Sequence, residues 1–163
     1  MAVLPIVRWP DARLTTRCAE VGADEDVRDL VRDMLDTMYD APGRGLAAPQ
    51  VGVLKRLFVM DVTWKEGHPD PVVMINPDIL WMSEERSIGP EGCLSLPGIA
   101  PEVKRAERIR VRWTDLEGQQ AEAEFSGFAA ICVQHEFDHL DGIVTLMRLS
   151  PQARASAEAA YLL

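Results

Sequence analysis

Cysteine and histidine are scarce in this chain of 163 residues, which contains three of each. The cysteines (Cys18, Cys93 and Cys132) stand far apart and form no C-x-x-C pair, so we expect no disulfide framework and a reducing compartment, the cytoplasm. No apolar run reaches the roughly 18 residues of a membrane-spanning helix, so no membrane partner is expected. The N-terminus lacks a basic stretch and contains Pro5 and Pro10, which argues against a signal peptide.

Basic residues are also in deficit. Lysine and arginine number 17 against 26 acidic side chains, which gives a formal net charge of −9. Because phosphate binding requires clustered cations, this balance argues against direct binding of nucleic acid. Apolar residues make up 47% and charged residues 26% of the chain, as in ordinary globular proteins. The length is that of a single domain over residues 1–163.

Hydrophobic periodicity predicts helices near both ends of the chain and strands between them. Apolar residues recur at three- and four-residue steps from Asp24 to Tyr39, which is the pattern of one buried helix face. Further helices are predicted over 127–140 and from Pro151 to the C-terminus. Short apolar or alternating runs predict strands over 56–62, 72–76, 109–113 and 121–125, separated by turns at 67–70, 76–78 and 116–118. This order favours an α+β fold with a mostly antiparallel sheet.

The segment His135-Glu-Phe-Asp-His139 has the pattern H-E-x-x-H. On a helix, residues four apart lie one above the other, so both imidazoles can bind one metal ion. Glu136 can then take a proton from a water molecule at the open coordination position. The surrounding residues are apolar nearly all round, which predicts a buried helix. The alternative is a pair of core histidines that are hydrogen-bonded to the backbone.

Two histidines do not complete a catalytic metal site, which usually takes three protein ligands. Cys93, in the segment Glu91-Gly-Cys-Leu-Ser95, offers a strong soft thiolate, and Gly92 removes a side chain beside it. The alternative for Cys93 is a small buried apolar residue. Thr145 stands at the position of a third metzincin ligand but would bind weakly, and Glu158 could serve as the third ligand of a zinc protease.

The segment Gly43-Arg-Gly-Leu-Ala-Ala-Pro-Gln50 follows the first predicted helix. Gly43 and Gly45 would end that helix and let the backbone approach another chain or a ligand closely. The side-chain amide of Gln50 could stabilise an oxyanion. The alternative is a loop with Gln50 on the surface.

A stripe of side chains on the second predicted helix leads to the first histidine. Phe128, Ile131, Cys132 and His135 are spaced i, i+3, i+4 and i+7. Such a stripe could receive an unbranched apolar side chain such as that of methionine, or it could be plain core. Cys132 lies one turn from His135, so we expect it in the pocket wall and not among the ligands.

The three segments together resemble the signature motifs of the peptide deformylase family, which have the form G-hydrophobic-G-L-A-A-x-Q, E-G-C-L-S and H-E-x-D-H. Here they lie at 43–50, 91–95 and 135–139, in that order. The resemblance covers most of the chain. It implies one catalytic domain that removes the formyl group from the N-terminal formyl-methionine of nascent peptides and releases formate. It also implies an α+β fold in which the H-E-x-x-H helix packs against antiparallel strands.

The resemblance also implies roles for individual residues. The implied metal ligands are Cys93, His135 and His139. Glu136 would be the general base and later the acid, while the Gln50 amide and the Leu94 backbone N–H would stabilise the oxyanion. The native ion of the family is usually Fe²⁺, with Zn²⁺ or Ni²⁺ often found instead, and the donor set suits all three. The implied partners are N-formylated nascent peptides, and docking to the ribosome stays open.

Seven residues are expected to contact the substrate, and one of them departs from the family pattern. The seven residues are Gly43, Arg44, Gly45, Gly92, Phe128, Ile131 and Cys132. Arg44 stands where the family usually has valine or isoleucine, so its guanidinium must point to solvent or meet an acidic group, and it could narrow the pocket. Ala100 lies in a run that lacks a basic residue used by some members to hold the peptide backbone, and Arg105 lies further on. Met147 replaces a common acidic residue.

These departures keep two alternatives open. Arg44 and Ala100 would suit a deformylase-like metalloenzyme that acts on a different N-formyl or N-acyl amine. A deformylase-like binding protein without turnover is the other alternative, and it is disfavoured because Glu136 and Gln50 would then have no function.

Overall fold

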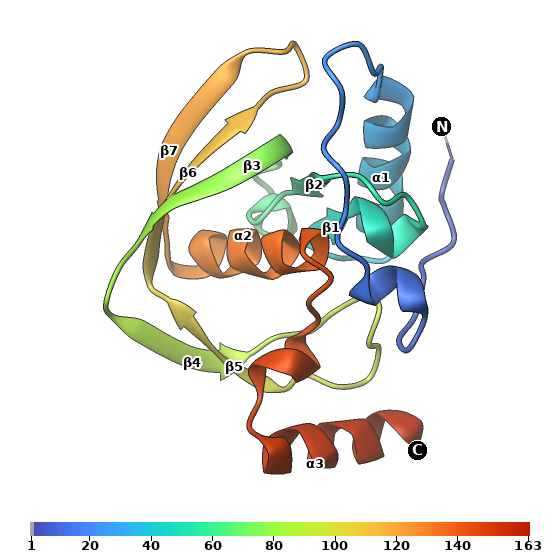
Figure 1. Ribbon diagram of the computed structural model, residues 1–163, viewed down its shortest axis with the longest axis vertical. Coiled ribbons are helices and arrows are strands. Elements are labelled where there is room, and N and C mark those ends of the chain that lie inside the picture. Colours follow the sequence, from blue (N-terminus) through green and yellow to red (C-terminus); the bar gives the residue numbers. More distant parts are fainter. Residues whose placement is uncertain (1) are drawn as a thin grey trace.

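Three α-helices and seven strands make up the computed structural model, which describes residues 2–163 (Figure 1). The helices are α1 (Arg28–Asp40), α2 (Gly127–Leu140) and α3 (Pro151–Leu162). The strands are β1 (Gly45–Ala47), β2 (Leu57–Met60), β3 (Val72–Met82), β4 (Arg86–Pro90), β5 (Glu102–Ala106), β6 (Arg108–Thr114) and β7 (Gln120–Ser126). No helix among the described residues has the length and apolar character needed to cross a membrane.

All pairings between these strands are antiparallel. Five strands form one sheet in the order β1-β2-β3-β6-β7, and β4 and β5 form a separate two-stranded sheet. The α+β class and the antiparallel sheet that the order of elements predicted are therefore confirmed.

Strand β2 is covered by a helix on each face of the sheet. All four of its residues are buried, and successive side chains point to opposite faces. Leu57 and Val59 pack with α1 in one apolar cluster, whereas Phe58 and Met60 pack with α2 in another. This burial on both faces explains why β2 is a continuous apolar run and not an alternating one.

Helix α2 crosses between the five-stranded sheet and the β4–β5 pair, as Figure 1 shows. Ala130, Val133 and Leu140 are fully buried against the sheet. The predicted limits of this helix, 127–140, are confirmed. The prediction that the helix is buried all round is wrong at Phe128, which is 52% exposed and lines a cavity.

The N-terminal segment is bonded to two loops that carry sequence motifs. The backbone N–H of Val7 donates to the Gln50 carbonyl at 2.7 Å, and that of Trp9 donates to the Ser95 carbonyl at 2.9 Å. Val7 also packs in one apolar cluster with Cys93. The segments 43–50 and 91–95 are therefore both held by the same stretch of chain.

Helix α1 begins at Arg28, later than the predicted start at Asp24. The acidic side chains before it serve a turn instead. Glu25 accepts the Gly22 N–H and the Lys55 ammonium, each at 2.9 Å, and Asp26 accepts the Arg28 N–H at 3.1 Å. Carboxylates that bond to nearby backbone N–H groups favour turns and helix starts over helix interiors.

The turn predicted at 76–78 is wrong, because β3 continues through it. Asn76 has a φ of 48°, and its side-chain amide bonds to both backbone groups of Val21 at 2.9 Å. The register against β6 shifts between Ile75 and Asp78. The Asn-Pro-Asp sequence is thus a bulge inside a long strand. The sequence also did not predict β1, β4 or β5.

Candidate metal centre and active site

Cys93, His135 and His139 meet between α2 and the loop that follows β4. Their ligand atoms all lie within 4.8 Å of one another. The ring centroids of the two histidines are 5.0 Å apart, and Cys93 Sγ lies 3.5 Å from His139 Nε2. All three residues are largely shielded from solvent. The fold therefore brings together one thiol and two imidazoles from segments that are more than 40 residues apart in the sequence.

The spacing of these groups fits one transition-metal ion. A sulfur at about 2.3 Å and a nitrogen at about 2.1 Å from an ion, at the tetrahedral angle, lie roughly 3.6 Å apart. The 3.5 Å between Cys93 Sγ and His139 Nε2 is close to that value. A thiolate with two imidazoles also suits Fe²⁺, Zn²⁺ or Ni²⁺ and not the hard cations Mg²⁺ and Ca²⁺.

Glu91 orients His135 from the side opposite the thiol. Its Oε1 lies 2.9 Å from His135 Nδ1. Glu91 also accepts two hydrogen bonds from the Arg105 guanidinium, at 2.8 and 2.9 Å. Burial would raise the pKa of Glu91, but the bonds from Arg105 and His135 outweigh it and lower the pKa to about 2. The carboxylate is therefore charged at neutral pH, so His135 Nδ1 carries the proton and Nε2 is left for an ion.

A row of ions continues behind Arg105, from the buried Asp138 to Arg148, whose side chain is 45% exposed. Arg105 Nη1 donates to Asp138 Oδ2 at 2.7 Å, and Asp138 accepts two further bonds from Arg148, at 3.0 and 2.6 Å. Burial would lower the pKa of Arg105, but Glu91 and Asp138 raise it above its usual range. Each charge in this row has an opposite neighbour, which is the condition under which buried ions are tolerated.

Arg105 does not line the cavity, because it is 5% exposed and is held by Glu91 and Asp138. The alternative of a zinc protease is wrong. Glu158, the third ligand of the protease alternative, lies on α3 and pairs with Arg154 at 2.6 Å. Glu158 is not part of the ligand cluster.

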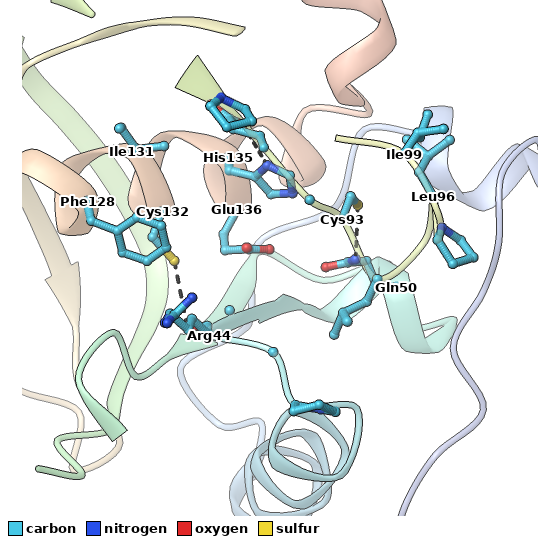
Figure 2. Close-up of a pocket in the computed structure, with 18 of the residues that line it drawn as sticks. Arg44, Gln50, Cys93, Leu96, Ile99, Phe128, Ile131, Cys132, His135 and Glu136 are labelled. Carbon is cyan, nitrogen blue, oxygen red and sulfur yellow. Dashed lines mark hydrogen bonds and ion pairs between the residues drawn. The ribbon is translucent and has the colours of Figure 1, made fainter. Parts of the chain in front are cut away.

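Glu136 lies in the same enclosed space as the ligand cluster. It is 4% exposed, and its Oε1 has no hydrogen-bond partner among residues 2–163. Burial raises its pKa to about 7, with His135 opposing the shift and Glu91 adding to it. Figure 2 shows the carboxylate pointing into the pocket, between Cys132 and Gln50. A carboxyl group that titrates near neutral pH can both take and return a proton.

Gly45 leaves the space that the Glu136 carboxylate occupies. A Cβ at position 45 would lie 2.5 Å from Glu136 Oε2 and 2.9 Å from Cys132 Sγ. A Cβ at position 43 would lie 2.9 Å from the Leu94 side chain. These contacts are the physical reason for glycine at both positions, since any side chain there would displace its neighbour.

Gln50 faces the thiol from a 3₁₀ turn over Ala48–Val51. Its Oε1 accepts the Ala47 N–H at 2.9 Å, which fixes the amide. Its Nε2 donates to Ser95 Oγ at 3.1 Å and lies 3.7 Å from Cys93 Sγ. Gln50 is 1% exposed, so the alternative of a surface location is wrong.

A cavity of about 430 Å³ opens beside the cluster. Its wall contains all the residues expected to contact substrate: Gly43, Arg44, Gly45, Gly92, Phe128, Ile131 and Cys132. The Cys132 thiol donates to the Arg44 carbonyl at 3.7 Å, and burial raises its pKa well above the usual range, so it is a neutral part of the wall. A Cβ on Gly92 would meet nothing within 4 Å, so this residue borders open space.

Arg44 forms no ion pair with an acidic group among residues 2–163, so that alternative for its guanidinium is wrong. Its guanidinium carbon lies 5.3 Å from the centroid of the Phe128 ring, so the side chain packs on an aromatic face. Figure 2 shows both residues on the same side of the pocket as Cys132, away from Gln50 and Cys93. The positive charge is thus kept at the cavity wall.

The residues that orient the ligands had no role assigned from the sequence. The segment E-G-C-L-S contains Glu91 and the segment H-E-F-D-H contains Asp138, but neither pattern predicts what these two carboxylates bind. The sequence did indicate that these carboxylates need a partner, because a carboxylate in a buried segment must be paired with a cation or a hydrogen-bond donor. The partner, Arg105, could not be identified, because it lies in a strand that the sequence did not predict.

The comparisons with known proteins agree with this geometry. The family model described as Polypeptide deformylase matches residues 3–155. The chain is 52% identical over 155 residues to a peptide deformylase of Alkalilimnicola ehrlichii, covering 94% of this chain and 86% of that relative. It is 46% identical over 159 residues to a peptide deformylase of Wolbachia pipientis wMel, covering 92% and 89%.

Solved structures show the same similarity in three dimensions. A peptide deformylase of Legionella pneumophila superposes with a TM-score of 0.91 at 40% identity, covering 98% of this chain and 94% of that one. A peptide deformylase of Ehrlichia chaffeensis in complex with actinonin superposes with a TM-score of 0.89 at 44% identity, covering 96% and 94%. The match extends over nearly the whole length of both partners.

Proposed function

The chain belongs to the polypeptide deformylase family, and we propose which of its residues carry out the reaction of that family. The reaction is hydrolysis: the chain removes the N-formyl group from nascent peptides, so that one water and one formamide give formate and a free amine. The single observation that supports the assignment of roles is the meeting of Cys93, His135 and His139 beside Glu136 in one cavity.

We propose Cys93, His135 and His139 as the ligands of one divalent ion, natively Fe²⁺, with Zn²⁺ or Ni²⁺ able to replace it. When bound, such an ion polarises a carbonyl oxygen and lowers the pKa of water. The charged Glu91 supports this role of His135, because it keeps the proton on Nδ1 and would leave Nε2 available to bind an ion.

Glu136 moves the proton in both halves of the reaction. As general base, its carboxylate takes a proton from the attacking water. As general acid, it returns that proton to the amine nitrogen when the C–N bond breaks. Its enclosure supports both roles, and burial raises its pKa to about 7, closer to neutral pH than the pKa of an exposed carboxyl group.

The formyl oxygen gains negative charge during the attack, and we propose two N–H donors that stabilise it. The first is Gln50 Nε2, whose amide is fixed by Ala47 and Ser95. The second is the backbone N–H of Leu94, which has no acceptor among residues 2–163. Fixed donors that meet charge only as it develops lower the barrier without reorganising.

The cavity binds the first side chain of the peptide. Phe128, Ile131 and Cys132 form an apolar wall from α2 that leads to His135, and an unbranched side chain such as that of methionine fits along it. Residues 1–163 act as a single catalytic domain. The cytoplasm is the proposed compartment, since a thiolate ligand and three unpaired cysteines require reducing conditions. Formylated N-termini would be met as they leave the ribosome.

Formate release from formyl-Met-Ala-Ser by the anaerobically prepared, Fe²⁺-loaded protein tests this proposal. The wild-type protein is expected to release one formate for each free amine formed. Cys93→Ala should lose both bound metal and activity, whereas Glu158→Ala, on α3 and outside the ligand cluster, should keep both. Absence of formate from the wild-type protein, or full metal content in Cys93→Ala, would contradict the proposal.

A further inference from the structure

The mouth of the cavity carries positive charge in a chain whose net charge is −9. Arg44 and Lys65 both line it. Among residues 2–163, neither forms an ion pair with a carboxylate, whereas most of the other arginines do. Two uncompensated cations on one cavity wall attract anionic groups locally, even though the whole molecule is acidic.

The acidic residues of the cavity do not neutralise these cations. Glu91 is held by Arg105 and His135, at 2.8 to 2.9 Å. Glu136 lies beside the ligand cluster, and its side chain is not bonded to Arg44. The charge of Arg44 does act on the wall, because it opposes the effect of burial on the pKa of Cys132.

Arg44 is held in place by contacts that leave its donors free. The guanidinium lies over the Phe128 ring at 5.3 Å. Its backbone carbonyl accepts the Asp61 N–H at 2.8 Å and the Cys132 thiol at 3.7 Å. Among residues 2–163, no acceptor takes a hydrogen bond from the guanidinium. A guanidinium carries its N–H groups in its own plane, where they fit a carboxylate in bidentate geometry.

Lys65 adds to the charge from a neighbouring turn. It belongs to a 3₁₀ turn over Trp64–Glu66, and its ammonium lies 5.7 Å from the Trp64 ring centroid. The Trp64 indole N–H donates to the Gly43 carbonyl at 2.9 Å. This bond fixes the turn to the residue that precedes Arg44, and both cations line the same cavity.

We propose that Arg44 is a specificity-determining residue that binds a carboxylate of the formylated substrate, with Lys65 in support. This inference rests on the proposed function and narrows it to formyl-peptides with an acidic side chain near the N-terminus. The carboxylate can come from two positions. It is either the side chain of the formylated residue, reaching along the Phe128 wall, or the side chain of the next residue, at the mouth of the cavity.

Matched pairs of peptides test the proposal. The first pair is formyl-Glu-Ala-Ser and formyl-Gln-Ala-Ser, and the second is formyl-Met-Glu-Ser and formyl-Met-Gln-Ser. In each pair only the charge differs. For the pair whose carboxylate meets Arg44, kcat/KM of the wild-type protein is expected to favour glutamate by about tenfold, the usual size of a charge-assisted bond. The preference should shrink as salt is added.

Three variants assign the effect to Arg44. Arg44→Met should bring the ratio to about one, and Arg44→Lys should restore part of it. Arg32→Met removes one exposed positive charge from α1, away from the cavity, and should leave the ratio unchanged. A ratio of one for both pairs in the wild-type protein overturns the proposal, even if Arg44→Met does not fold. A wild-type ratio that survives in Arg44→Met overturns it as well.

The proposed function can fail separately. Formate release from all four peptides without a charge preference would keep the function and reject the role of Arg44. If no peptide releases formate, the role of Arg44 can still be tested by measuring the affinities of the metal-loaded protein for the deformylated peptides. Tighter binding of Met-Glu-Ser than of Met-Gln-Ser, or of Glu-Ala-Ser than of Gln-Ala-Ser, supports the carboxylate contact, and equal affinities in both pairs reject it.

Discussion

Glu91 Oε1 lies 2.9 Å from His135 Nδ1, and this bond joins an imidazole that we propose as a metal ligand to a row of paired ions. In Glu91→Gln the neutral amide can no longer balance Arg105 or hold the imidazole firmly. We expect the affinity for Zn²⁺ to fall by about 10- to 100-fold, the usual effect of removing such a partner. Competition with a chromophoric chelator measures it.

Glu85→Gln is the matched control, because Glu85 is an exposed partner of Arg108. Unchanged Zn²⁺ affinity in Glu91→Gln would show that the bond does not help to hold the ion.

The low pKa of Glu91 predicts a specific dependence of stability on pH. The folded-state value of about 2 lies below the reference value of 4.5, so the ionised group stabilises the fold above pH 4.5. This contribution, on the order of 3 kcal/mol, is lost as the pH falls from 4.5 toward 2. Urea unfolding of the metal-free protein should show a gap between wild type and Glu91→Gln near neutral pH that narrows in acid. A gap independent of pH would mean that the charge is not the cause.

Glu136→Gln should remove the proton acceptor and leave the metal ligands intact. We expect kcat to fall by roughly 10²- to 10⁴-fold, the range for general acid–base catalysis. Metal content should stay equal to that of the wild-type protein. Equal losses of metal and activity would indicate a structural role.

The same carboxyl group predicts the acid limb of the pH profile. Burial raises its pKa to about 7, and a bound cation lowers it again because it favours the charged form. In the wild-type protein, kcat/KM should therefore decrease as the pH is lowered, with an apparent pKa at or below 7. The residual activity of Glu136→Gln should lack this limb.

Gly45→Ala places a Cβ where the Glu136 carboxylate lies, 2.5 Å from Oε2. The displaced carboxylate should cost about 100-fold in kcat, as expected for a misplacement of about 1 Å. Gly89→Ala is the control, since a Cβ there meets nothing within 4 Å. Comparable kinetics for the two variants would mean that the backbone of β1 shifts to accommodate the new Cβ and that Glu136 stays in place.

The ligand-bearing helix could be predicted with its limits, whereas the elements that orient the ligands could not. Helix α2 is marked by a continuous apolar pattern between Gly127 and Gly142, so residues close in the sequence determine where the helix begins and ends. The start of α1 was misplaced, because Glu25 bonds to Lys55, a contact between distant residues. The negative charges at residues 24–26 alone could not indicate whether these acidic residues lie inside the helix or before its start.

Strands β4 and β5 were missed for a related reason. Arg86–Pro90 contains one apolar residue, Ile88, and ends in Gly89 and Pro90, which are turn signals. It becomes a strand only because it pairs with residues 102–106. Arg105 lies in that partner strand, in a charged run typical of an exposed surface, so its burial beside Glu91 had no local signal.

The segment around Val7 and Trp9 sets a practical limit on how this protein can be handled. Its backbone bonds to the carbonyls of Gln50 and Ser95, and it shares an apolar cluster with Cys93. We therefore expect a purification tag fused close to residue 7, or a deletion there, to disturb the segments that carry Cys93 and Gln50 more than the imidazoles on α2. Preparations that differ only at their leading end are thus not equivalent samples for metal analysis.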